Sequence, residues 1–195
     1  MVKSRNTVKD DARTALLAAA REAFAQGGQA AVAVIPVCEA AGLTTGALYH
    51  HFQNRSGLLR ALIEDVAAWV AQQAVKAMEP ETDDWAKLRA GVNAVLDACL
   101  EPVVRNTYNE APSIVGLEEW RAIEESKTGV LLVETLLRLQ QRGALKPVSI
   151  PLLASMVKGA IVEGAMSITR SAKPKQTRRE AGQLLDAMLA ALRVE

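Results

Sequence analysis

Apolar residues recur every three or four positions along almost the whole chain, which is the spacing of one face of an α-helix. No segment of the sequence shows the alternation of apolar and polar residues, or the β-branched runs, that are typical of a strand. The pattern therefore predicts an all-α fold of about nine helices. We expect three helices to form an N-terminal head over residues 1–54 and longer helices to form a body over residues 55–195.

The body is expected to begin with a long helix that ends before Pro80, because proline cannot continue a helix. Asp83 or Asp84 is placed to cap the next helix, and Pro102 is placed to bend or break it. Residues 106–112 are expected to be irregular. The expected helices of the body span about 55–78, 85–103, 113 or 117 to 141, 149–171 and, from the capping-box sequence Thr177-Arg-Arg-Glu180, 177 to the end of the chain.

The segment from Ala40 to Phe52 carries the most informative pattern. Gly42 stands between two short helical patterns, and two short helices joined by such a turn are typical of a helix-turn-helix, whose second helix enters the major groove of DNA. Thr44 and Thr45 fall at the start of this second helix, where hydroxyls cap free N–H groups or bind a phosphate. The candidate DNA contacts all lie on or beside this helix: Thr44, Thr45, Gly46, Ala47, Tyr49, His50 and Arg55.

Several residues of this segment have a second interpretation. Tyr49 could pack in the core instead of reaching a phosphate, and Arg55 could be a solvated residue of a first helical turn. His50 and His51 point about 100° apart on a helix and have no neighbouring cluster of ligands, so we expect no metal site. Three apolar side chains are expected to form the core of the head: Phe24, Leu48 and Phe52.

The stretch Ala-Ala-Gly-Leu-Thr-Thr-Gly-Ala-Leu-Tyr-His-His-Phe resembles the signature of the tetracycline-repressor (TetR) family of bacterial regulators. The resemblance extends over residues 11–62, where Asn54-Arg55 resembles the start of the family's fourth helix. Two positions depart from the family pattern. Pro36 replaces a common acidic residue, which a first helical turn tolerates. Ala33 replaces the usual Ser or Thr, so one phosphate contact that the resemblance implies is lost.

Composition and charge agree with this resemblance. Of the 195 residues, 50% are hydrophobic, which is enough to bury a core. Residues 1–60 hold seven Lys or Arg against four Asp or Glu, a net charge of +3, whereas residues 61–195 hold sixteen against eighteen, a net charge of −2. A basic head on a slightly acidic body favours DNA binding by the head alone.

The sequence also predicts where the protein resides. No run reaches the roughly 20 apolar residues that a membrane span needs, and the polar N-terminus lacks the core of a signal peptide. We therefore expect a cytoplasmic protein without membrane contact. Cys38 and Cys99 are expected to be reduced and to act as small hydrophobic residues instead of forming a disulfide.

Residues 149–171 are apolar in almost every direction of a helical wheel, so a helix there must be covered on both sides. One cover is the body of the same subunit, and a second subunit is a natural candidate for the other. The TetR resemblance implies the same arrangement, in which the last two helices of each subunit form a four-helix bundle in a homodimer. The residues expected at this interface are Gly159, Ala160, Gly164, Ile168, Leu184, Leu185 and Met188.

Aromatic and methionine side chains of the body are candidates for a pocket that holds a small-molecule effector, although such residues also pack in ordinary cores. Glu163 is a carboxylate on a largely apolar helix, so it either pairs with an Arg or Lys or recognises a donor on a ligand. The candidate pocket residues are Trp69, Trp85, Tyr108, Trp120, Met156, Glu163 and Met166.

These observations predict a sequence-specific transcriptional regulator, a repressor released from a palindromic DNA operator by a small apolar or aromatic effector. Two alternatives are an effector-independent activator or architectural DNA-binding protein, and an enzyme on a helical scaffold. Both histidines lie in the head and neither cysteine stands beside a recognisable base, so no catalytic triad, metal cluster or phosphate loop can be assembled. We expect no enzymatic activity, no cofactor and no metal.

Overall fold

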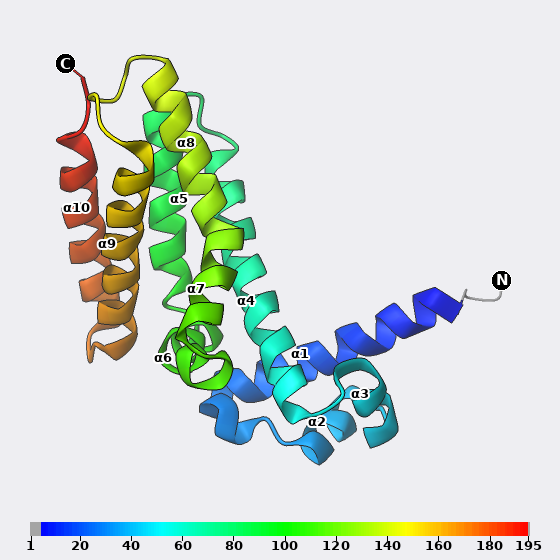
Figure 1. Cartoon of the computed structure of the whole chain (residues 1–195). Helices are drawn as coiled ribbons and strands as arrows, with labels where there is room; N and C mark the ends of the chain where they lie inside the picture. Colours follow the sequence, from blue (N-terminus) through cyan, green and yellow to red (C-terminus); the bar gives the residue numbers. More distant parts are fainter. Residues whose placement is uncertain (1–4, 195) are drawn as a thin grey trace. The chain divides into compact units, whose positions relative to one another are not determined.

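The computed structural model of the chain describes residues 5–194 (Figure 1). Helices α7, η1 and α8 follow one another without a break, so the described residues form nine separate helices, as the pattern predicts. No strand occurs between residues 5 and 194, where the β pairing is an isolated bridge between Leu145 and Arg193. The elements are α1 (Arg5–Ala31), α2 (Val34–Ala41), α3 (Thr45–Phe52), α4 (Arg55–Met78), α5 (Asp84–Ala98), α6 (Pro102–Val115), α7 (Leu117–Glu124), the π-helix η1 (Glu125–Gly129), α8 (Val130–Gln141), α9 (Ile150–Arg170) and α10 (Pro174–Ala190).

Two local predictions are wrong. Residues 106–112 are not irregular but lie within α6, which buries an apolar face that includes Val104, Tyr108 and Ala111, and this packing outweighs the weak helix propensity of the asparagines and Pro112. The capping box at Thr177 is also absent, because α10 begins earlier, at Pro174. The Thr177 hydroxyl instead donates a hydrogen bond to the Ser171 hydroxyl at 2.7 Å.

The described chain forms two compact units, and their boundary differs from the one predicted at residue 54. Unit 1 combines the chain up to Val66 with residues 102–117, and unit 2 combines residues 67–101 with residues 118–195. Helix α6 therefore belongs to the same unit as the predicted head, although it begins about fifty residues after the head ends in the sequence. Helix α4 begins in unit 1 and ends in unit 2.

Unit 1 is built around α1, against which α2, α3 and α6 pack. Its fully buried side chains include Leu16, Phe24, Leu48, Leu58 and Leu62, at helical spacing on their elements. This confirms Phe24 and Leu48 as core residues, and Phe52 is also buried. The regular core fixes the positions from which the polar residues of α3 project.

Helix α6 holds the backbone of α1 through two polar side chains. The Asn106 amide donates a hydrogen bond of 2.6 Å to the carbonyl of Phe24, and the Glu110 carboxylate accepts one of 2.7 Å from the backbone N–H of Gln29. At this point α1 is kinked, with Gly28 at φ 62°. A Cβ on Gly28 would lie 2.0 Å from Oε1 of Glu110, so only glycine accepts this approach.

In unit 2, helices α5, α8, α9 and α10 lie side by side (Figure 1). Their shared core includes Leu96, Leu136, Leu139, Ile168 and Leu189. Cys99, at the end of α5, is fully buried, and burial first, then the nearby Glu124 carboxylate, raise the pKa of its thiol to about 12. Both cysteines are free and buried, which confirms that they act as small hydrophobic residues.

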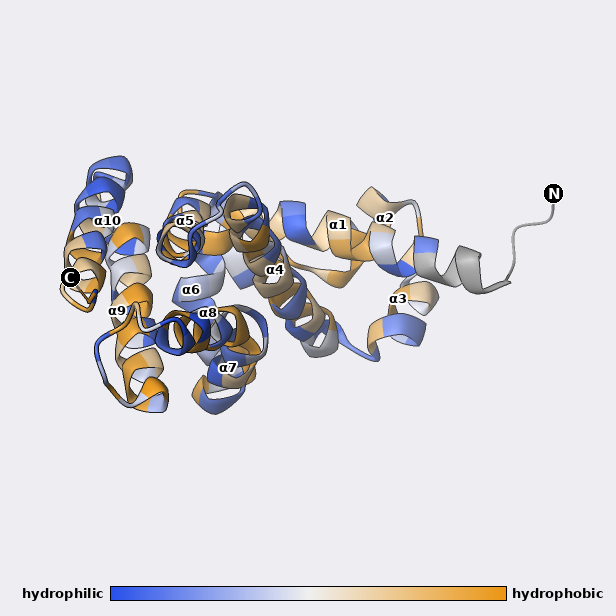
Figure 2. Ribbon diagram, turned by 90° about the horizontal axis from the view of Figure 1, so that it is seen from above, coloured by the Kyte–Doolittle hydropathy of each residue, from blue (hydrophilic) through white to orange (hydrophobic). Residues whose placement is uncertain are grey.

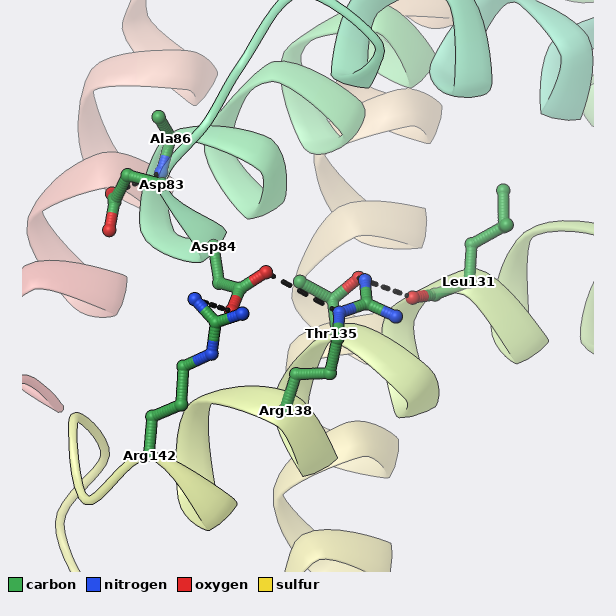
Figure 3. A network of polar contacts seen from close by, with 7 residues as sticks. All are labelled: Asp83, Asp84, Ala86, Leu131, Thr135, Arg138 and Arg142. Carbon is green, nitrogen blue, oxygen red and sulfur yellow. Dashed lines mark hydrogen bonds and ion pairs between the residues drawn. The ribbon is translucent and has the colours of Figure 1, made fainter.

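A polar network joins the start of α5 to α8 (Figure 3). The side chain of Asp83 caps α5 by accepting a hydrogen bond of 2.9 Å from Ala86 N–H, as predicted. Asp84 is only 3% exposed, and its carboxylate lies 3.4 Å from Nε of Arg138 and 3.1 Å from Nη1 of Arg142. Because two cations and the helix N-terminus face this carboxylate, its burial is compensated.

Helix α9 meets the length and apolar composition of a membrane span, alone among the helices within residues 5–194. The sequence argument missed this because Lys158 and Glu163 interrupt the apolar run. Core helices of globular proteins pass the same two criteria. In the structure α9 packs against α5, α8 and α10, which makes it an integral part of the helical bundle of unit 2.

Candidate DNA-binding site

The turn between α2 and α3 depends on Gly42. Its backbone is left-handed, with φ 65° and ψ 30°, a conformation that glycine adopts without the steric cost of a side chain. The N–H groups of Gly42 and Leu43 then bond the carbonyls of Glu39 and Cys38, at 3.1 and 2.9 Å, and satisfy the end of α2. The chain therefore turns within three residues and starts α3 in a new direction, which is the helix-turn-helix geometry that the sequence predicts.

Helix α3 has one buried face and one exposed face. Leu48 and Phe52 point into the core of unit 1, whereas Tyr49 is 50% exposed. Most of the remaining predicted DNA contacts are exposed as well, and Ala47 is half-buried. The exposed residues on or immediately before α3 are Thr44, Thr45, Gly46, Tyr49 and His50.

Thr44 is the N-cap of α3, as predicted. Its hydroxyl oxygen accepts a hydrogen bond of 3.3 Å from Ala47 N–H, and its backbone is extended. The first N–H groups of a helix have no carbonyl partner within it, and they carry the positive end of the helix dipole. This end of α3 is consequently suited to face a phosphate, and Gly46 beside it adds no side chain to keep a DNA backbone away.

Arg55, predicted as a phosphate contact, forms hydrogen bonds within unit 1. Its Nε donates a hydrogen bond of 2.6 Å to the carbonyl of Val32, and its Nη2 donates a short one to the carbonyl of Gln29. The guanidinium thus ties the start of α4 to the connection between α1 and α2. We therefore treat Arg55 as a positioning residue of the head, because its donors serve backbone carbonyls inside unit 1.

Sequence reasoning missed a tight approach between α3 and α4. Gln53 has φ 64°, and the Asn54 carboxamide oxygen accepts a hydrogen bond of 2.8 Å from Gly57 N–H, which caps α4. A Cβ on Gly57 would lie 2.1 Å from the carbonyl oxygen of Phe52. A glycine in the first turn of a helix was the signal available in the sequence, because glycine otherwise weakens a helix.

The start of α2 contains both departures from the family pattern. Ala33 stands at the N-cap with extended backbone, and no side chain caps the helix there. Pro36 lies within the first turn, and α2 forms despite it. On the buried side of α2, burial and the nearby Glu39 raise the pKa of the Cys38 thiol, so it stays neutral in the core of unit 1.

Comparisons with known proteins agree with this geometry. Residues 16–62 match the family described as bacterial regulatory proteins, tetR family, and residues 85–192 match the family described as tetracyclin repressor-like, C-terminal domain. The chain belongs to the TetR family. Members of this family are transcriptional regulators and not enzymes, and α3 occupies the second position of the helix-turn-helix, from which such motifs enter the major groove.

Curated relatives support the assignment over part of their length. UidR of Escherichia coli, a transcriptional regulator, is 33% identical over 63 residues, which are 32% of each chain. AcnR of Corynebacterium glutamicum, a transcriptional repressor, is 29% identical over 115 residues, which are 54% of this chain and 60% of that protein. This TetR-family chain thus covers between a third and three fifths of the length of these relatives.

Solved structures cover the fold more completely. A TetR-family regulator from Pectobacterium atrosepticum superimposes with a TM-score of 0.80 at 26% identity and covers 99% of both chains. The structure of RolR in complex with resorcinol superimposes with a TM-score of 0.72 over 96% of this chain and 90% of that one, at 17% identity, which shows a shared fold alone. The TetR fold therefore extends over both units.

The residues predicted at the dimer interface of this TetR-family protein fall on two different faces. Ile168 and Leu185 are buried in the core of their own unit, and a Cβ on Gly164 would lie 3.5 Å from Leu96. These three face the inside of the subunit, since a helix in a bundle presents only part of its surface outward. The other predicted residues are exposed or half-buried, with exposed fractions of 66% for Leu184 and 56% for Met188.

The predicted pocket residues do not gather in one place. Tyr108 belongs to unit 1, whereas Trp69, Trp85 and Trp120 belong to unit 2. Trp85 is buried and lines a cavity of about 290 Å³ with residues of α5 and α10. Two of the predicted residues, Met156 and Glu163, are exposed on α9, and Met156 is 66% exposed. They cannot line an internal pocket of a single chain, because their helix turns them outward.

Proposed function

We propose that this TetR-family protein is a homodimeric, cytoplasmic repressor that reads a palindromic operator with α3 and loses affinity for it when a small molecule binds unit 2. The observation that carries this proposal is the division of α3 into a buried apolar face and an exposed polar face that begins with the capped N-terminus at Thr44. Such a helix presents base-reading and phosphate-binding groups together.

An exposed apolar surface supports a dimer. We define the α9–α10 face by four residues that are each more than half exposed: Leu152 and Met156 on α9, and Leu184 and Met188 on α10. Figure 2 shows the apolar character that runs along much of α9. Exposed apolar residues that gather on two neighbouring helices are typical of an interaction site, and a twofold axis lets two identical helix pairs cover each other.

The effector step of the proposal rests on similarity of fold and on chain connectivity. RolR, which shares the fold, has been solved with a bound small molecule, resorcinol. In the present chain, α4 is continuous from unit 1 into unit 2, and α6 of unit 1 lies between α5 and α7 of unit 2 in the sequence. A ligand that favours one arrangement of unit 2 can therefore change unit 1 through three covalent connections, one within α4 and one at each end of α6.

Selection of binding sites from a pool of random DNA duplexes tests the DNA-reading role. The wild-type protein should enrich a palindrome, and Thr45→Ala should change the bases preferred near the centre of each half-site, because Thr45 is exposed at the start of α3. Thr82→Ala, at an exposed threonine outside α3, is the control and should return the wild-type motif. No enrichment by the wild-type protein, or one motif for all three proteins, would contradict the proposal.

A further inference from the structure

A second cavity in unit 2 lies between the helix pair η1–α8 and α9. Its volume is about 360 Å³, which lies within the range of sites for small molecules. The helices α8 and α9 follow each other after a short connection and pack together. The lining residues are Glu125, Gly129, Leu132, Val133, Leu137, Ile150, Pro151, Ala154, Ser155 and Lys158.

The lining of this cavity is divided by polarity. At the end next to the α8–α9 connection, the walls are apolar and include Leu137 and Ile150. At the opposite end, Nζ of Lys158 forms a short ion pair with the carboxylate of Glu125. Ile150 and Lys158 are eight residues apart on α9, which corresponds to about 12 Å along a helix. The cavity therefore offers an apolar slot with one polar end.

The π-helix forms the polar end. A π-helix inserts an extra residue into a helical ladder, is rare, and is frequent at functional sites. Here it places Gly129, which is buried, directly beneath Glu125. A Cβ on Gly129 would lie 2.8 Å from the carboxylate carbon of Glu125. The absence of a side chain at Gly129 thus allows the Glu125 carboxylate to lie over η1 at the rim of the cavity, where it pairs with Lys158 and both side chains remain partly exposed.

We propose that this cavity is the effector site, and that it takes an uncharged, mostly apolar molecule with a hydroxyl group at one end, such as an alkylated phenol. The inference rests on the proposed function, and it adds the place and the chemical class of the effector. Lys158 and Glu125 neutralise each other at the partly exposed rim of the cavity, so a charged ligand has to compete with this pair for one of its charges, whereas an uncharged ligand leaves the pair intact. A hydroxyl both donates to Glu125 and accepts from Lys158.

The helices that line the cavity continue toward the DNA-binding head and toward the proposed dimer interface. The lining residues Glu125 and Gly129 lie on the unbroken helix α7–η1–α8, and only Gly116 separates this helix from α6 in the sequence. On the opposite wall, α9 also carries Met156 of the α9–α10 face. A ligand that changes the spacing of η1 and α9 therefore acts on the two elements that lead to the head and to the second subunit.

Three para-propyl aromatic probes that differ in their polar group test the chemical class. Para-propylphenol, para-propylbenzoate and para-propylbenzylamine are titrated into the full-length protein by calorimetry at pH 7, where they are neutral, anionic and cationic. We expect the phenol to bind at least tenfold more tightly than either charged probe. Equal affinities for the three probes, or tighter binding of a charged one, would overturn the assigned class.

Variants of the two charged residues test where the polar group of the ligand binds. Glu125→Gln leaves Lys158 without its counterion and should raise the affinity for the benzoate at least tenfold, whereas Lys158→Met should do the same for the benzylamine. Ala154→Leu fills the cavity and should abolish binding of the phenol, while Ala187→Leu, which lines the cavity beside Trp85, should leave it unchanged. If both charge variants keep the wild-type order of affinities for the three probes, the ligand does not bind beside Glu125 and Lys158.

Operator binding, measured on the selected DNA with and without the phenol, separates the two proposals. The inference predicts that a saturating phenol weakens operator binding at least tenfold, and that Ala154→Leu removes this effect. A protein that binds its operator but ignores the phenol overturns the effector site and leaves the DNA-reading role intact. A protein that binds the phenol but no DNA overturns the proposed function.

Discussion

Tyr49 and Arg55 are six residues apart, yet the structure gives them different tasks. Tyr49 is half exposed on the outer face of α3, where its hydroxyl is available to a DNA phosphate. Arg55 instead donates hydrogen bonds to the carbonyls of Val32 and Gln29. A basic residue beside a recognition helix can thus act on DNA indirectly, by fixing the backbone that carries the contacting residues.

Replacing Tyr49 by Phe should weaken binding to all DNA sequences alike. The loss of one hydrogen bond corresponds to about 0.5–1.5 kcal/mol, or roughly two- to tenfold in Kd. The melting temperature should not change, because the side chain is half exposed. Fluorescence anisotropy on operator and on unrelated duplexes measures the effect. If Tyr49→Phe binds as the wild type does, the hydroxyl makes no phosphate contact.

Replacing Arg55 by Gln should destabilise the head and leave the salt dependence of DNA binding unchanged. Loss of hydrogen bonds from a charged donor costs about 1.5–3 kcal/mol, which urea unfolding detects. A residue that neutralised a phosphate would instead reduce the slope of log Kd against log salt by about one. Arg60→Gln, at an exposed arginine on the same helix, is the control for loss of charge. A reduced slope together with unchanged stability would show that Arg55 contacts a DNA phosphate.

At this scale the sequence predicted the outward residues of α3 well, because helical periodicity alone separates Leu48 and Phe52 from Tyr49. The cap at Thr44 was equally visible, since it is a local feature. The hydrogen bonds of Arg55 could not be predicted from the sequence, because their acceptors lie more than twenty residues away and are backbone carbonyls, which any sequence would supply.

Whole elements depend on contacts that cross long stretches of sequence. Helix α6 contains asparagines and Pro112, so its local sequence favours a break, but its apolar face packs on α1 and stabilises the helix. The π-helix η1 has no sequence signal apart from Gly129. By contrast, the end of α4 was predicted from Pro80, because proline cannot continue a helix. The end of α8 also has a local cause, since Gly143 is left-handed with φ 66°.

The contact between α3 and α4 gives a matched pair of glycine substitutions. Gly57→Ala should destabilise the protein by more than about 2 kcal/mol, since its Cβ would lie 2.1 Å from the Phe52 carbonyl oxygen. Gly46→Ala, where the nearest atom is 3.7 Å away, should stabilise α3 by about 0.5 kcal/mol and still weaken DNA binding. Thermal unfolding and anisotropy measure both. Equal stability of the two variants would show that α3 does not approach α4 as described.

For the whole molecule, periodicity predicted a dimer bundle from the last two helices, but three of the seven residues that it named for the interface face the inside of their own subunit. Apolar residues surround α9, so the sequence alone could not separate the side that packs on its own subunit from the side that is free. The structure places Ile168 and Gly164 inside and leaves Leu152 and Met156 outside. Packing against α5, α8 and α10 decides between these sides.

Met156→Arg should therefore produce a folded monomer, since Met156 is 66% exposed and a charge there disrupts only a partner's apolar surface. Gly164→Arg should instead lower the melting temperature, because its side chain would enter the core beside Leu96. Analytical ultracentrifugation and circular dichroism distinguish the two outcomes. A dimeric Met156→Arg protein would move the interface away from the α9–α10 face.

The central claim is that two copies of α3 read one DNA site together. Hydroxyl-radical footprinting of the wild-type protein on its selected operator tests this most directly. We predict two protected segments on each strand, related by twofold symmetry and centred about 10 base pairs apart or a multiple of that distance, with both segments lost in Met156→Arg. A single protected segment, or two segments that persist in a monomeric Met156→Arg protein, would contradict the claim.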